Sequence, residues 1–178
     1  YDYATDVCTG PNGNIYVAGY TKANSGADED LLLLKIDSSL SSITVETFST
    51  VSTSASYDRL NSVLYANGML YVTGLYDSDS GRTYSGRVLM AVEPTDLSIL
   101  NDYGNIGSDG TNTYEGLSLV SDSLGNIYLT SREDTMSDTY FWTLSKFDSN
   151  LTEDLSGSFG QAFDNGNLSV QHIDDEDN

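Results

Sequence analysis

The chain has 178 residues, which is enough for one domain with a sizeable hydrophobic core. Its 27 acidic residues against 7 lysines and arginines give a net charge of −20, which repels nucleic acids and anionic membrane surfaces. No apolar run approaches the roughly 20 residues of a membrane-spanning helix, so we expect neither nucleic-acid binding nor membrane insertion. The acidic surface suits cations, basic partners or a salty medium, or it only keeps an extended β-protein soluble.

Composition favours strands over helices. The chain has 13 tyrosines, many small polar turn formers and only 2 prolines, which is typical of strands joined by tight turns. Cys8 is the only cysteine, so no disulfide can form within the chain, and we expect it to pack as a small apolar side chain.

Four markers recur in the same order: an aromatic–acid pair, a glycine turn entering an alternating strand, an apolar run with a charged end, and a polar turn closing on leucine. Their copies lie at Tyr1, Tyr57 and Tyr114; at 13–19, 68–74 and 125–131; at 34–37, 91–93 and 145–148; and at 37–40, 93–97 and 148–151. The aromatic markers are 56 and 57 residues apart. This agreement predicts one structural unit repeated three times.

Each unit is expected to contain four antiparallel strands. In the second unit these strands are predicted at 60–65, 69–75, 87–92 and near 97–103. Asn67 and Gly68 supply the positive φ angles of a two-residue hairpin between the first two. Four hairpin-connected strands per unit are typical of a β-propeller blade.

The hydrophobic pattern of residues 31–36 favours the propeller over other all-β folds. This predicted strand is apolar almost throughout, as expected where a strand is covered on both faces. A sandwich or an up-and-down barrel would alternate apolar and polar residues in most strands, and a β-helix needs much shorter rungs. The predicted fold class is therefore all-β, built from four-stranded antiparallel propeller blades.

One partial propeller domain is expected to span residues 1–178. Its blades are predicted at 1–56, 57–113 and 114–162, with the first strand of a fourth blade within 163–178. Phe163 and Asp164 repeat the aromatic–acid marker, and residues 167–170 resemble the first strand of the third unit. A disordered acidic tail from Ile173 is the alternative. Since three blades do not close a ring, we expect the remainder in the same protein or in further copies of the chain.

The first unit carries a family resemblance. Residues 13–21, reading GNIYVAGYT, followed by LLLLKID at 31–37, resemble the bacterial and archaeal seven-bladed propeller repeat. The second unit departs from that pattern at Met69 and at 91–93, and the third has Ser131 in place of a glycine. The resemblance implies blade architecture in modular surface or secreted proteins, and it implies no shared reaction.

Acidic residues cluster in the loops between the second and third strands of each unit. Asp77, Asp79, Asp28 and Asp30 are the candidate metal ligands, because alternating carboxylates followed by a glycine begin many calcium loops. The bidentate acid that should close such a loop is missing, because Val88 stands there. A solvated turn without a metal is the alternative interpretation. We expect no cofactor other than Ca²⁺.

Catalytic signatures are weak. His172 is the only histidine, which argues against zinc and against a Ser-His-Asp triad. Acid pairs for glycoside hydrolysis carry no information among 27 acids. We predict a non-enzymatic extracellular or cell-surface scaffold that binds a protein or glycan ligand. A calcium-dependent carbohydrate-binding module and a fragment of a propeller hydrolase or lyase are the alternatives.

Overall fold

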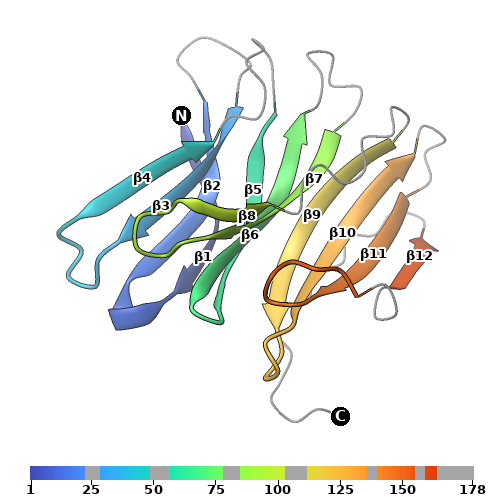
Figure 1. Ribbon diagram of the computed structural model, residues 1–178. Coiled ribbons are helices and arrows are strands. Elements are labelled where there is room, and N and C mark those ends of the chain that lie inside the picture. The colour runs from blue at the N-terminus through green and yellow to red at the C-terminus, as the bar shows by residue number, and fades with distance from the viewer. Residues whose placement is uncertain are drawn as a thin grey trace.

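The computed structural model describes residues 1–22, 29–48, 57–77, 85–102, 112–135, 140–154 and 159–163. These residues form three four-stranded antiparallel sheets, each with its strands side by side in chain order (Figure 1). The first sheet contains β1 (Asp2–Thr9), β2 (Ile15–Lys22), β3 (Glu29–Ile36) and β4 (Ile43–Phe48); the second β5 (Arg59–Ala66), β6 (Met69–Asp77), β7 (Ser85–Val92) and β8 (Ile99–Asp102); the third β9 (Asn112–Ser121), β10 (Ile127–Thr135), β11 (Tyr140–Phe147) and β12 (Phe159–Phe163).

The all-β prediction is confirmed, and the four strands expected in the second unit appear as β5 to β8. A single 3-10 turn at Pro11–Gly13 is the only helical element in the described ranges, and no helix there could cross a membrane. Phe163, which was expected to open a fourth unit, is the last residue of β12 and pairs with Tyr140. Residues 164–178 lie outside the described residues, so the strand at 167–170 stays a prediction.

The connections between the first two strands of the first and second sheets share a pair of left-handed residues. Asn67 and Gly68 have φ angles of 52° and 81°, which matches the left-handed pair that a two-residue hairpin needs. Asn12 and Gly13 repeat these angles in the first sheet at 59° and 75°. The sequence pattern therefore determined these turns locally.

A β-bulge interrupts the first strand of every sheet at the same place. The extra residues are Thr5, Asn61 and Leu117, at intervals of 56 residues. Gly74 faces the bulge of β5, where a Cβ atom would collide with the backbone carbonyl of Arg59. Gly19 meets Tyr3 in the same way. Glycine is used here for close approach of two backbones, and only secondarily for flexibility.

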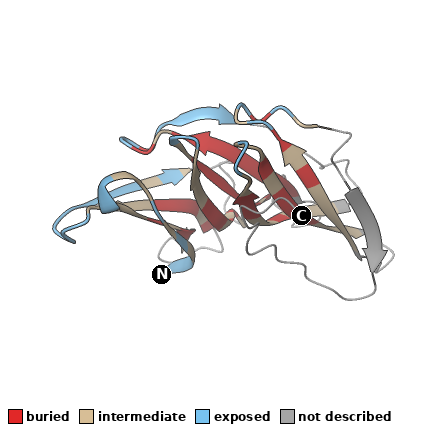
Figure 2. Ribbon diagram, turned by 90° about the horizontal axis from the view of Figure 1, so that it is seen from below, coloured by how far each residue is buried: buried red, intermediate tan, exposed pale blue. Residues whose placement is uncertain are grey.

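The sheets pack face to face through two apolar cores, which Figure 2 shows as buried segments in the interior. One core joins Tyr16, Leu31 and Leu33 of the first sheet to Leu70 and Val72 of the second. The other core joins residues on the opposite side of the second sheet, Tyr71, Leu89 and Ala91, to Ile127, Leu129 and Phe147 of the third. The second sheet is therefore covered on both faces, as the apolar central strands require.

The two sheet–sheet contacts have the same register. Tyr16 Oη donates to the Pro94 carbonyl at 3.0 Å, and Tyr71 Oη donates to the Ser149 carbonyl at 2.9 Å, each reaching 78 residues along the chain. β1 lies against β5, and β5 against β9. Each sheet is thus placed on the next by one repeated operation.

The bulge residues reinforce that register. Thr5 Oγ1 donates to the Leu60 carbonyl at 2.6 Å, and Asn61 Nδ2 donates to the Gly116 carbonyl at 2.8 Å. In both cases the acceptor immediately precedes the bulge residue of the next sheet. The bulges therefore join neighbouring first strands by side-chain hydrogen bonds.

The turn between the third and fourth strands places a leucine in the left-handed region in all three sheets. Leu40, Leu97 and Leu151 have φ angles of 59°, 63° and 61°. A residue with a side chain is strained there by about 1 kcal/mol or more. Leu97 and Leu151 are only 1% and 3% exposed and belong to the two cores, so burial offsets the strain. Leu40 is 70% exposed.

Candidate functional site

The candidate calcium ligands are not brought together by the described residues. Asp30 lies in β3 opposite Thr21, and Asp77 ends β6 in a different sheet. Asp28 and Asp79 lie outside the described residues. Within the ranges described, no group of three or more metal-ligating side chains is present. The calcium site stays a prediction.

Glu29 forms a buried ionic link between the first and second sheets. Its side chain is 4% exposed and accepts from Arg59 Nε at 2.5 Å, while Lys22 Nζ lies 3.5 Å from its other oxygen. The hydrogen bond to Glu29 raises the pKa of the Arg59 guanidinium. Arg59 also lies over the rings of Tyr20 and Tyr57, at 4.6 and 5.3 Å from their centroids. This carboxylate thus joins the first sheet to the second through Arg59.

Glu115 of the third sheet pairs with Arg132 of the same sheet and accepts a hydrogen bond from Asn61 of the second sheet. Glu115 Oε2 accepts from Arg132 Nη2 at 2.8 Å, and its Oε1 accepts from Asn61 Nδ2 at 2.9 Å. Arg87, buried in β7, donates from Nη1 to Ser131 Oγ at 2.9 Å. The bonds from Asn61 and Arg87 connect the second sheet to the third, whereas the pair of Glu115 with Arg132 lies within the third sheet. The sequence did not reveal the contacts between sheets, because their partners are 30 or more residues apart in the chain and only one aromatic–acid marker flags the position of Glu115.

Several acids serve as turn caps. Asp37 accepts from the backbone of Ser41 at 2.7 Å and of Ser42 at 3.2 Å, and the bonds from Ser41 hold its pKa well below the usual range. Asp148 accepts from the backbone of Asn150 and Thr152 in the equivalent turn. Part of the acidic composition is therefore structural, because a side-chain carboxylate replaces missing backbone acceptors in a turn.

Cys8 packs against the core between the first two sheets. Burial, together with the charge of Asp6, raises the pKa of its thiol to about 12. The thiolate is the nucleophilic form of cysteine, and the raised pKa favours the thiol form of Cys8 at neutral pH. His172 lies outside the described residues.

The face of the first sheet that points away from the second sheet is apolar and exposed; we call it the open face. Two of its cross-strand rows are apolar, as the pairing of β1 to β4 shows: Val7, Val17, Leu34 and Val45, and next to them Thr9, Ile15, Ile36 and Ile43. The row at the far end of the same face, Asp2, Thr21 and Asp30, carries two acids. Val7, Val45 and Ile43 are 60%, 54% and 63% exposed.

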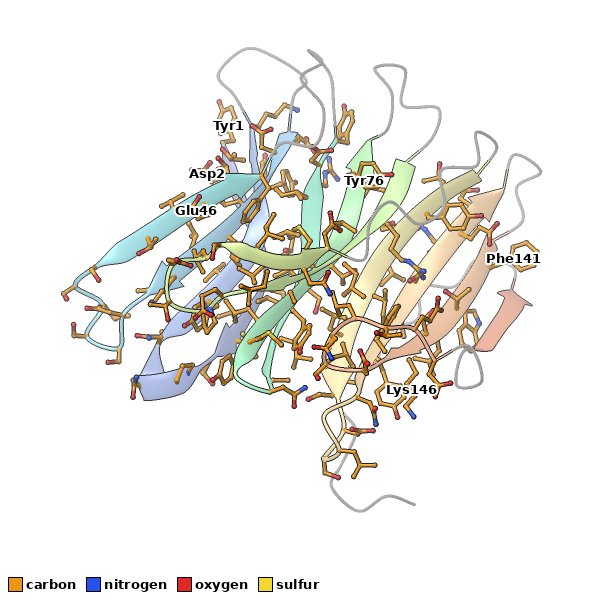
Figure 3. The ribbon with its side chains drawn as sticks, viewed as in Figure 1. Tyr1, Asp2, Glu46, Tyr76, Phe141 and Lys146 are labelled. Carbon is orange, nitrogen blue, oxygen red and sulfur yellow. The ribbon has the colours of Figure 1, made fainter. Side chains whose placement is uncertain are left out.

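Figure 3 labels Glu46 on β4; the alternation of the strand turns this acid to the other face. The open face thus has no charged residue in its two apolar rows, although the chain has a net charge of −20. Uncharged apolar patches of this kind mark interaction sites.

No protein-family model matches the chain, and no curated protein matches it.

Proposed function

We propose that the chain forms blades of a β-propeller that acts as a non-enzymatic interaction scaffold at the cell surface or outside the cell. Each four-stranded sheet is one blade in this proposal, and the adjacent strands β1, β5 and β9 line the central axis. The setting outside the cell follows from the resemblance of the first unit to the seven-bladed propeller repeat, and the acidic charge is compatible with it.

The repeated register between sheets carries the proposal. Tyr16 and Tyr71 reach carbonyls 78 residues ahead with the same geometry, and the bulge residues of the first two sheets hydrogen-bond to the sheet that follows. A stack in which each unit binds the next by one operation is what a radial repeat requires, whereas the two layers of a sandwich face each other once.

The use of the charged side chains supports a scaffold role. Glu29 with Arg59 links the first sheet to the second, and Glu115 accepts from Asn61 across the second and third sheets, so these carboxylates take part in contacts between sheets. The open face supports the interaction role, because it offers apolar area at the end of the stack.

A structure of the assembly formed by the natural protein tests the architecture. We expect a ring of four-stranded sheets around an axis lined by the first strand of each. A closed hydrogen-bonded barrel, or two layers facing each other, would contradict it. Turnover of glycoside, ester and peptide substrates tests the scaffold role: activity that is lost on changing one pair of acids would show an enzyme.

A further inference from the structure

The open face has the same residue types as two faces that are buried inside the molecule. Val17 corresponds by strand register to Val72 of the second sheet and Leu129 of the third, both of which are 0% exposed. Ile15 corresponds in the same way to Leu70 and Ile127, which are also fully buried. In each buried case the tyrosine-bearing face of the preceding sheet covers these positions.

Leu40 repeats a strained conformation without the burial that offsets it elsewhere. Its φ of 59° matches those of Leu97 and Leu151, which lie in the cores between sheets. Leu40 itself lies exposed beside the open face. A preceding sheet placed by the same operation would cover Leu40 as the first sheet covers Leu97.

The third sheet has the matching outward face. Ile127 and Leu129 point to the second sheet, so the alternate positions Thr130 and Leu144, which pair with each other, point away from it; Thr130, in the centre of the sheet, is 0% exposed. Leu144 corresponds by register to Leu33 and Leu89, each fully buried against the sheet that follows. Leu144 is only partly buried.

We propose that the open face binds a second copy of this chain, whose third sheet docks on it head to tail. Two copies then join at both ends into a closed ring of six sheets, within the range of four to eight that propellers use. In this ring Ser38, at the turn position of Pro94 and Ser149, presents its carbonyl to Tyr128 of the other copy. Tyr128 Oη donates to Asp122 Oδ2 at 3.0 Å in the single chain, so docking exchanges one acceptor for another. The inference rests on the proposed propeller.

The primary test is the mass of the 178-residue chain in solution, measured by sedimentation between about 1 and 100 µM. We expect twice the 19.3 kDa of one chain. Association should strengthen from about 0.02 to 0.3 M salt, because salt screens the repulsion between two chains of net charge −20. A monomer at the highest concentration, or a mass above two copies, overturns the two-copy ring.

Matched variants locate the interface. Val45→Glu on the open face should raise the dissociation constant at least tenfold. Leu100→Glu on β8 is the control, because Leu100 is 52% exposed against 54% for Val45, and it should change the constant by less than about twofold. Circular dichroism at low concentration verifies that both variants are folded. Equal effects of the two substitutions overturn the assignment of the open face.

Mixing tests the head-to-tail geometry. Val45→Glu and Leu144→Glu should each weaken self-association, but a mixture of the two retains one intact interface and should form a heterodimer. Failure of the mixture to associate, while both variants are folded, overturns head-to-tail docking. Head-to-tail docking is also overturned if Leu144→Glu leaves the dimer intact. In that case the open faces of the two copies would bind each other. The inference is overturned if the 178-residue chain is monomeric and one longer natural chain supplies all the sheets of the ring. The proposed function would still hold in that case.

Discussion

The first and second sheets contain the same four strands, glycine turn and first-strand bulge, yet their apolar residues are buried differently. Val72 is 0% exposed, whereas its counterpart Val17 is only partly buried. The second sheet has a neighbour on each face, and the first has a described neighbour on one. The comparison shows that the position of a sheet in the stack, and not its sequence pattern, sets how much an apolar side chain contributes to stability.

The largest expected difference is between Leu97 and Leu40. Leu97→Ala leaves a cavity in the core between the first two sheets and should lower the free energy of unfolding by about 2–5 kcal/mol. Leu40→Ala removes an exposed side chain and should change it by less than about 0.5 kcal/mol in the single chain. Urea denaturation at low protein concentration measures both. Equal losses would remove the distinction between the two sheets.

The glycines opposite the bulges should behave alike in the two sheets. Gly74→Ala and Gly19→Ala each force a Cβ atom against a backbone carbonyl within one sheet, so each should destabilise the chain by about 1–3 kcal/mol. Thermal unfolding followed by circular dichroism measures the effect. A loss at Gly74 alone would show that packing between sheets, and not the bulge, requires the glycine.

The tyrosine hydroxyls test the repeated register between sheets. Tyr16→Phe and Tyr71→Phe each leave a turn carbonyl without its donor and should lower the free energy of unfolding by about 1 kcal/mol. Tyr3→Phe serves as the control, because Tyr3 is 48% exposed and stacks on Tyr20. Losses of different size at Tyr16 and Tyr71 would show that the two contacts are not equivalent.

The smallest effect is expected at Asp37, in an exposed turn of the first sheet. Hydrogen bonds from Ser41 lower the pKa of this carboxyl, so the folded state favours its ionised form. The stabilisation is present above the ordinary pKa of about 4 and is lost as the pH falls toward the lowered value. Asp37→Asn should therefore differ most from the unchanged chain at neutral pH and approach it in acid. Urea denaturation at several pH values measures this, and a difference that grows in acid would contradict the assigned cause.

Local features of this fold were predictable from the sequence. The hairpin at Asn67 and Gly68 and the four strands of the second unit follow from alternation and turn chemistry, which act over a few neighbouring residues. The link between Glu29 and Arg59 was not predictable, because a buried charge pair depends on which sheet packs on which. The same holds for the bulge contacts of Thr5 and Asn61, where nothing in the residue type identifies the acceptor.

The sequence by itself therefore determined the repeat, its strands and its turns, since each follows from short-range patterns that recur about every 56 residues. Only the tertiary structure decided which faces of those sheets are covered. Leu40 and Leu97 have the same place in the repeat and the same backbone conformation, but one is exposed and the other is buried. Burial depends on a neighbouring sheet, and no residue encodes the presence of its neighbour.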